Sequence, residues 1–298
     1  MPMRRTAGLV AFLIVVATIA SAPAQGQRGG SGGGQRIGSA GGQRGVPPGG
    51  RRGAPPPGAR RGGPSATSSR IEQRFYTLEA TNEDMEYAVF VSSKIDPKKP
   101  APLVIGLHGL GTPPAAWLGR ITDAAERAGY IVAAPTGYSL TGWYGANGPG
   151  RPVGDTNVGA LSEKDVLNVL DLMRAEFNID ERRIYLAGHS MGGAGALFLG
   201  IKHKHLWAAV SASAPAIRSN LHTPAEIEQA TDVPFILIHG DKDAAVPVEQ
   251  TRQWAAKMKA LKMTYEYREL GGGTHSSTLD DGAPHTFQFF DKHVKPPR

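Results

Sequence analysis

The sequence G-H-S-M-G at residues 188–192 places Ser190 between two glycines. The apolar run 183–187 precedes it, and the small and apolar residues 193–199 follow it. We expect a buried strand, a sharp turn and a helix, the context in which a serine can act as a nucleophile. The flanking glycines would let the strand and the helix pass closely. The Ser190 hydroxyl would then lie at a helix N-terminus, which stabilises developing negative charge.

A second group of residues is placed to bind an oxyanion. The apolar run 102–107 predicts a strand buried on both faces, and it ends in His108-Gly109-Leu110-Gly111. The tetrahedral intermediate of acyl transfer needs two N–H donors. We predict that Met191 supplies one backbone N–H and Leu110 the other. Taken alone, the 108–111 segment is equally compatible with an ordinary strand-to-helix turn.

A candidate acid follows the serine in the chain. The buried-strand run 234–238 ends in His239-Gly240-Asp241-Lys242-Asp243. We predict that Asp243 is the acid, because it lies just before Val246-Pro247 opens the next helix. Asp241 is interpreted as a turn residue. His239, like His108 and His189, stands at a strand end, and we expect these three histidines to shape loops.

A candidate base comes last. Residues 264–270 alternate as a strand does, and three glycines then lead to His275. We predict that His275 is the base, on a loop that can bring its imidazole toward Ser190. The alternative is His285, which we expect at the exposed start of the closing helix. The resulting order, serine, acid, histidine, is that of α/β-hydrolases.

From about Glu72 to the end, the chain resembles the α/β-hydrolase superfamily. More narrowly it resembles secreted bacterial esterases related to polyhydroxybutyrate depolymerase, feruloyl esterase and dienelactone hydrolase, and the prolyl oligopeptidase-like catalytic domain. The matching stretches are residues 102–109, 178–193 and 239–247. The resemblance implies that Ser190 is the nucleophile, Asp243 the acid and His275 the base. The chain departs from secreted depolymerases, which often carry cysteines, because it has none. It also lacks the β-propeller of an oligopeptidase.

The composition changes sharply along the chain. Residues 1–24 read as a signal peptide, with Arg4-Arg5, a short apolar core and the cleavage motif Ala22-Pro23-Ala24. An uncleaved N-terminal anchor is the alternative. Residues 25–70 are rich in Gly, Pro and Arg and predict a disordered linker, because they hold too few apolar side chains to offset the entropy of ordering. Residues 71–298 are the predicted catalytic domain.

The positive charge belongs to the N-terminal part. Ten of the 33 Lys and Arg residues precede Glu72, with no Asp or Glu among them, so the catalytic region has 23 basic against 26 acidic residues. We therefore predict no nucleic-acid partner. A weak attraction of the tail to anionic envelope surfaces stays an alternative to the simpler interpretation of a solvated spacer.

Strands and helices alternate through the catalytic region. We expect strands over 74–80, 85–92, 130–134 and 208–214, and helices over 113–128 and 248–261. A further helix is expected to start with Ser162 as its N-cap and to run to Phe177. This pattern predicts an α/β fold with a mostly parallel, doubly wound sheet covered by helices on both faces.

Residues 136–160 show no such periodicity. A long irregular segment in a compact domain is often functional. We predict that Trp143 and Tyr144, with Trp117, wall the substrate pocket. The alternative is that these aromatic side chains only pack the segment against the core.

These patterns together predict a secreted or periplasmic serine hydrolase that cleaves carboxylic esters through an acyl-enzyme. The substrate would be a small-molecule or polymer-derived ester. A serine peptidase of the prolyl oligopeptidase-like type, acting on short peptides, is the alternative. No cofactor and no metal are expected, and activity should fall as His275 becomes protonated. The sequence makes no prediction of oligomeric state.

Overall fold

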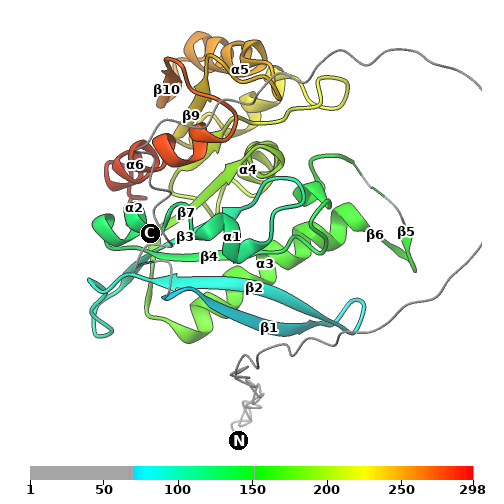
Figure 1. Cartoon of the computed structure of the whole chain (residues 1–298), viewed down its shortest axis with the longest axis vertical. Coiled ribbons are helices and arrows are strands. Elements are labelled where there is room, and N and C mark those ends of the chain that lie inside the picture. The colour runs from blue at the N-terminus through cyan, green and yellow to red at the C-terminus, as the bar shows by residue number, and fades with distance from the viewer. Residues whose placement is uncertain (1–66, 68–69, 149, 151, 298) are drawn as a thin grey trace, which may run out of the picture. The chain divides into compact units, whose positions relative to one another are not determined.

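The computed structural model describes residues 67, 70–148, 150 and 152–297 (Figure 1). The predicted signal peptide and, apart from Thr67 and Arg70, the predicted linker lie outside the described residues. The strands are β1 Glu72–Leu78, β2 Glu83–Val91, β3 Ala101–Leu107, β4 Ile131–Pro135, β5 Pro152–Val153, β6 Thr156–Asn157, β7 Ile179–His189, β8 Val210–Ser213, β9 Phe235–Gly240 and β10 Tyr265–Leu270. The helices are α1 Pro114–Leu118, α2 Thr122–Ala128, α3 Val158–Glu176, α4 Met191–Lys202, α5 Val248–Ala260 and α6 Ser277–Asp291, with short 3-10 turns η2 Trp143–Gly145 and η3 Pro224–Ala230.

Eight strands form one sheet in the order β1-β2-β4-β3-β7-β8-β9-β10. β2 is antiparallel to both of its neighbours, β1 and β4. The remaining six strands of this sheet, β4, β3, β7, β8, β9 and β10, run parallel to one another. The loops after β3, β7 and β9 therefore leave the same edge of the sheet, the edge at which ligands bind in open α/β folds. The predicted mostly parallel sheet is confirmed.

Two hydrophobic cores lie on opposite faces of this sheet. The alternation of β3 shows the division, because Leu103 and Ile105 belong to one core and Val104 to the other. The first core includes side chains of α3, α4 and α5, and the second includes side chains of α1, α2 and α6. All seven residues of β3 are buried, as expected for a strand covered on both faces. The predicted cover of helices on both faces is confirmed.

Three predicted helix boundaries were wrong. The helix expected over 113–128 is divided into α1 and α2, because the chain turns at Gly119-Arg120-Ile121. α3 begins earlier than expected: its N-cap is Asn157, whose Oδ1 accepts the Ala160 N–H at 2.6 Å. The predicted N-cap, Ser162, lies one turn inside the helix, and its hydroxyl donates to Val158 O. The closing helix α6 begins at Ser277, so His285 lies within it and not at its start.

The segment 136–160, which we expected to be irregular, contains little regular secondary structure. It contains the turn η2 and the small hairpin β5–β6 before α3 begins. Two consecutive aromatic residues of η2, Trp143 and Tyr144, have positive φ angles of 59° and 53°. Such backbone is strained for bulky side chains and persists only where the surroundings fix it.

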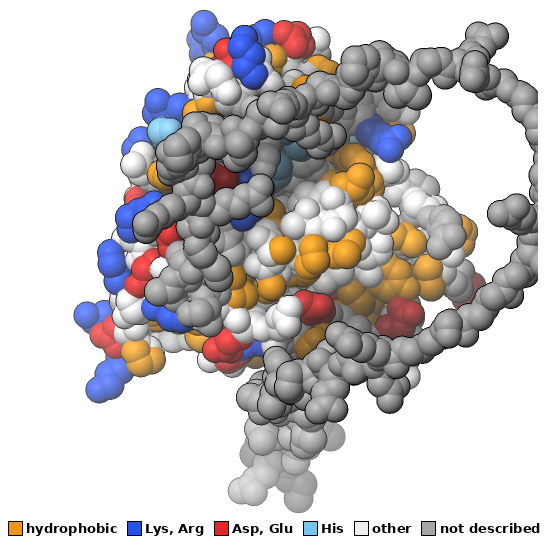
Figure 2. Space-filling view, viewed as in Figure 1, with side chains coloured by type: hydrophobic (Ala, Val, Ile, Leu, Met, Phe, Trp, Pro, Cys, Tyr) orange, Lys and Arg blue, Asp and Glu red, His pale blue; other side chains and the backbone are white. Residues whose placement is uncertain are grey.

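Side chains are unevenly distributed over the face seen in Figure 2. Hydrophobic side chains gather over α1 and α3, whereas Lys, Arg, Asp and Glu are concentrated along the side formed by α2 and α6. Within the described part of the chain, no helix is both long and apolar enough to cross a bilayer.

Candidate active site

Ser190 stands on a strained turn between β7 and α4. Its φ and ψ angles are 58° and −117°, outside the ordinary regions for a residue with a side chain. The turn needs both flanking glycines. A Cβ atom on Gly188 would lie 2.0 Å from Gly192 O, and one on Gly192 would lie 2.0 Å from Leu107 O. The sequence G-x-S-x-G therefore folds here as the predicted strand, turn and helix.

The structure brings together Ser190, Asp243 and His275, the three residues predicted to carry out the reaction. His275 Nε2 lies 2.9 Å from Ser190 Oγ, and His275 Nδ1 lies 2.7 Å from Asp243 Oδ2. The carboxylate can only accept, so Nδ1 carries a proton and Nε2 is left to accept the Ser190 hydroxyl proton. A hydroxyl hydrogen-bonded to an imidazole that a carboxylate orients can be activated as a nucleophile.

Asp243 is held in place by four donors. Its Oδ1 accepts the N–H groups of Ala245 and Val246, both at 2.8 Å, and its Oδ2 accepts His275 Nδ1–H. Burial alone would raise the pKa of Asp243, but these hydrogen bonds outweigh it and hold the pKa below its ordinary value. Asp243 is thus an anion with its lone pairs directed by the fold.

The fourth donor is His239, which the sequence pattern assigned only to loop shape. His239 Nε2 lies 3.1 Å from Asp243 Oδ2 and 3.2 Å from Val246 O. Both of these oxygens only accept, so Nε2 carries the proton, and Nδ1 accepts from the Thr251 hydroxyl at 2.7 Å. Burial lowers the pKa of His239 and keeps its ring neutral. Its position four residues before Asp243, at the end of the same strand, was the available sequence signal.

His189 ties the nucleophile turn to the loop of the base. Its Nε2 donates to His275 O at 2.8 Å, and the centroids of the two imidazole rings are 4.8 Å apart. Burial lowers the pKa of His189 to about 4, so this ring is neutral over the ordinary pH range. The two histidines therefore lie side by side without charge repulsion between them.

The loop that carries Leu110 lies close to the nucleophile turn. A Cβ atom on Gly109 would lie 3.5 Å from Ser190 Cβ, which shows how closely the loop after β3 approaches. The N–H groups of Leu110 and Met191 donate to no other group among the described residues. Met191 is the first residue of α4, where backbone N–H groups are free of intrahelical bonds.

The loop after β3 rests on the irregular segment behind it. Gly111 N–H donates to Leu140 O at 2.8 Å, and His108 N–H donates to Tyr144 Oη at 3.0 Å. Asp165 of α3 holds this segment in place, because its Oδ2 accepts Gly137 N–H at 2.6 Å. Burial raises the pKa of Asp165 to about 6, while its hydrogen bonds, including one from Tyr76 Oη at 2.5 Å, oppose that rise. The sequence pattern marked Asp165 only as the acid of the helix start predicted at Ser162, and it assigned Asp165 no role at the site.

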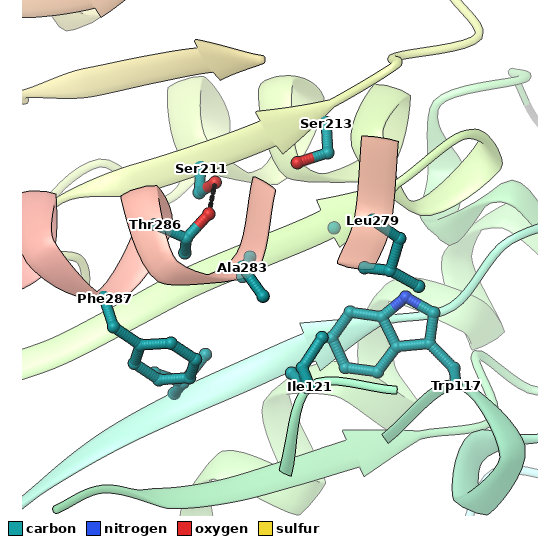
Figure 3. Close-up of a pocket in the computed structure, with 11 residues that line it drawn as sticks. Trp117, Ile121, Ser211, Ser213, Leu279, Ala283, Thr286 and Phe287 are labelled. Atoms are coloured by element: carbon teal, nitrogen blue, oxygen red, sulfur yellow. Dashed lines mark hydrogen bonds between the residues drawn. The ribbon is translucent and has the colours of Figure 1, made fainter. Parts of the chain in front are cut away.

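Two of the three aromatic residues expected to wall the pocket are buried. Trp117 is 2 % exposed, and its ring lies against Gly106 between the sheet and α6. Figure 3 shows its indole beside Ile121 and Leu279. These side chains line a cavity of about 20 Å³, to which Trp117 Nε1 brings an N–H without a partner among the described residues. Such a cavity has room for a water molecule.

Tyr144 is fully buried, with its hydroxyl on the His108 backbone, and so lies behind the loop after β3. Trp143 is half-buried, and of the three it alone presents a partly exposed ring. The structure therefore places Trp117 and Tyr144 in packing positions and leaves Trp143 as a surface that a substrate could touch.

The alternatives for acid and base lie elsewhere. Asp241 Oδ1 accepts Gly272 N–H at 2.7 Å, which makes it a turn residue, as interpreted from the sequence. His285 lies within α6, and among the described residues no hydrogen bond joins it to Ser190 or Asp243. The described residues contain no cluster of three or more His, Cys, Asp or Glu side chains suited to a metal ion.

The comparisons with known proteins agree with this arrangement. The model of the Phospholipase/Carboxylesterase family matches residues 157–293. The structure resembles that of a thermostable esterase, with a TM-score of 0.60 and 21% identity over 77% of this chain and 64% of the other. It also resembles a ferulic acid esterase from Anaeromyces mucronatus in complex with ferulic acid, with a TM-score of 0.58 and 17% identity over 75% of this chain and 90% of the other. The chain has the α/β-hydrolase fold. The predicted resemblance is thereby confirmed.

The relatives of this chain by sequence are named as esterases. The chain is 27% identical to a bifunctional acetylxylan esterase/xylanase of Neocallimastix patriciarum over 54% of its own length, but it spans only 22% of that relative. It is 29% identical to acyl-protein thioesterase 1 of Emericella nidulans, over 55% of this chain and 78% of the relative. These names support the prediction of an ester hydrolase, and they do not favour the peptidase alternative.

Proposed function

We propose that this α/β-hydrolase is a serine hydrolase that cleaves carboxylic esters through an acyl-enzyme. The observation that carries the proposal is the hydrogen-bonded line from Ser190 Oγ to His275 and on to Asp243, with distances of 2.9 and 2.7 Å. The esterase relatives support the choice of ester over peptide. The substrate class is a small-molecule or polymer-derived carboxylic ester.

The chemistry follows from the proton positions. His275 Nε2 takes the hydroxyl proton as Ser190 Oγ attacks the ester carbonyl carbon. Asp243 stabilises the imidazolium that forms. The N–H groups of Leu110 and Met191 bind the oxyanion. The imidazolium then returns the proton to the leaving alcohol. Water, deprotonated by the same imidazole, cleaves the acyl-enzyme and regenerates Ser190.

Labelling with a fluorophosphonate tests the nucleophile directly. Wild-type protein should be labelled on Ser190 and should hydrolyse para-nitrophenyl acetate, whereas Ser190→Ala should do neither. Ser219→Ala, which changes an exposed serine, is the matched control and should behave as wild type. Labelling that persists in Ser190→Ala would show that another residue is the nucleophile.

A paired set of ester and amide substrates tests the reaction class. The amide and short-peptide analogues of each ester should be hydrolysed at least about a hundredfold more slowly, because the protein is built for alcohol leaving groups. Comparable kcat/KM for a peptide and an ester would support the peptidase alternative and contradict the proposal.

We also propose that the protein is exported, on the strength of the signal-like composition of residues 1–24. The test is N-terminal sequencing of protein recovered from the cell exterior or periplasm of a bacterial host. A mature chain that starts at or near Gln25 is the expected result. Full-length protein found only in the cytoplasm would contradict the proposal.

A further inference from the structure

Two segments, the one after β8 and the one around η2, meet near the nucleophile turn. After β8, Ala216 N–H donates to Ser190 O at 3.0 Å, so this segment starts in contact with the nucleophile itself. His222, in the same segment, lies 2.7 Å from Ala146 O, at the end of the η2 turn, through its Nε2. The His222 ring packs on Phe198 of α4. Phe198 follows Ser190 by eight residues on α4, a rise of about 12 Å along the helix.

An arginine at this junction has no carboxylate partner. Arg218 is exposed, and its guanidinium carbon lies 5.3 Å from the centroid of the Trp143 ring. Other arginines of the described region pair with Asp or Glu, as Arg74, Arg120 and Arg252 do. No ion pair of Arg218 occurs among the described residues. Its charge is thus available to a ligand.

Trp143 is a fixed platform for that cation. Its ring is half-buried and packs against the core formed with α3, α4 and α5. Its positive φ of 59° is strained for a bulky residue, and the turn is held by the Ala146 N–H bond to Trp143 O at 2.8 Å. Strained backbone is concentrated at active sites and ligand-binding sites.

The contact of the Arg218 guanidinium with the Trp143 ring indicates the kind of ligand. A guanidinium that lies over an indole uses its face, and its in-plane N–H groups remain free. Those N–H groups form the fork that matches the two oxygens of a carboxylate. Holding the guanidinium on Trp143 also reduces the side-chain entropy lost when a ligand binds. A lysine would offer neither the plane nor the fork.

We propose that Arg218 and Trp143 form a subsite that binds a carboxylate group carried by the ester substrate. The proposal rests on the proposed ester hydrolysis at Ser190 and adds to it a preference for anionic esters. The carboxylate can lie in the acyl part or in the alcohol part of the ester, and substrates of both kinds distinguish these positions.

The test compares isosteric pairs of esters that differ in one charge. The acyl pair is para-nitrophenyl hemisuccinate and para-nitrophenyl levulinate. The alcohol pair is para-carboxyphenyl acetate and para-carbamoylphenyl acetate. For each pair, the ratio of kcat/KM of the anionic to the neutral ester is measured with wild type, Arg218→Gln, Arg218→Lys and Arg218→Glu. Arg127→Gln removes the same charge from the exposed end of α2 and is the matched control.

In at least one pair, Arg218→Gln should lower the ratio about tenfold, mainly through KM of the anionic ester, because a paired charge is lost from a partly exposed site. Arg218→Lys should recover part of it, and Arg218→Glu should lower it further. Arg127→Gln should keep the wild-type ratio. The proposal is wrong if both ratios are the same in Arg218→Gln and in wild type.

Different results would contradict the carboxylate subsite and the proposed ester hydrolysis. If fluorophosphonate labels Ser190 and neutral esters are hydrolysed, but no ratio depends on Arg218, the subsite is wrong and the esterase proposal stands. If Ser190 is not labelled and no ester is hydrolysed, the proposed function is wrong and the subsite falls with it.

Discussion

At the scale of single residues, the site depends on which nitrogen atoms carry protons and on which Asp243 oxygen accepts each of them. Asp243 accepts from two backbone N–H groups and two imidazoles, so each of its oxygens has a defined partner. His239 is one of these imidazoles and is itself fixed by Thr251. Because charge-assisted hydrogen bonds are stronger and shorter than neutral ones, His239 should hold the carboxylate in the orientation that His275 needs.

Replacing His239 tests this role. His239→Leu should lower kcat for para-nitrophenyl acetate by roughly tenfold to a hundredfold with little change in KM, because a hydrogen bond to a charged group contributes about 1.5–3 kcal/mol. His239→Gln, which keeps an amide donor, should recover part of kcat. Steady-state kinetics and thermal unfolding of the same samples separate lost positioning from lost folding.

The exposed His205 supplies the control, and His205→Gln should match wild type. A kcat for His239→Leu within twofold of wild type, in folded protein, would show that three donors suffice for Asp243 and that His239 is only a packing residue.

At the scale of elements, α3 supports the loop that carries Leu110. Asp165 of α3 is fully buried and bonds Gly137 and Tyr138 N–H groups of the irregular segment. That segment in turn bonds the loop after β3 through Leu140 O and the Tyr144 hydroxyl. The contacts form one continuous path from a buried carboxylate to the backbone next to Leu110.

The pKa of Asp165 makes a prediction about stability. It is about 6 in the native state, above the value of about 3.9 for an unfolded chain, so the native state binds this proton more tightly. The contribution of Asp165 to the free energy of unfolding is therefore present below about pH 4 and is lost as the pH rises to about 6. Asp165→Asn should remove this dependence, worth about 3 kcal/mol between the two limits.

Urea unfolding of wild type and Asp165→Asn at several pH values measures the effect. The difference between their free energies of unfolding should shift in favour of the variant as the pH rises from about 4 to about 7. Asp171→Asn, on the exposed face of the same helix, should follow the wild-type curve. Parallel curves for wild type and Asp165→Asn would mean that Asp165 titrates normally.

At the scale of the whole molecule, charge and catalysis are assigned to different parts of the chain. Ten of the 33 basic residues precede Glu72, and every residue predicted to take part in the reaction follows it. Residues 64–298 form one compact unit by their own contacts. We therefore expect the N-terminal part to act through its charge and not through the site.

A chain that starts at Pro64 tests this division. It should keep its Tm within about 2 °C and its kcat/KM for para-nitrophenyl acetate within about twofold of the chain that starts at Gln25, because every residue assigned to the site follows Glu72 in the sequence. Binding to anionic vesicles at low salt should be lost, since the remaining region is nearly neutral or slightly acidic. Cosedimentation with vesicles at two salt concentrations measures this. Equal vesicle binding by both chains would place the attractive charge on the catalytic region.

The sequence by itself determined the features that depend on local pattern and chain order. Buried parallel strands appear as short apolar runs, so β3, β7 and β9 and the residues at their ends could be placed in advance. The G-x-S-x-G turn could also be predicted, because no residue but glycine fits beside Gly192 O and Leu107 O. Helix boundaries were less accurate, since Asn157 and Ser162 are both good N-caps and only packing chose between them.

The tertiary structure alone decided which side chains meet across the chain. His239 and Asp243 are close in sequence, but the bond between them depends on how the β9 loop folds back. In the sequence, Trp117 and Trp143 are equally plausible as aromatic residues near the site. In the structure, Trp117 lies in the core on one face of the sheet, whereas the ring of Trp143 contacts Arg218 at the surface. Periodicity reports whether a residue is buried, but it does not report what the residue is buried against, because that depends on contacts between distant segments.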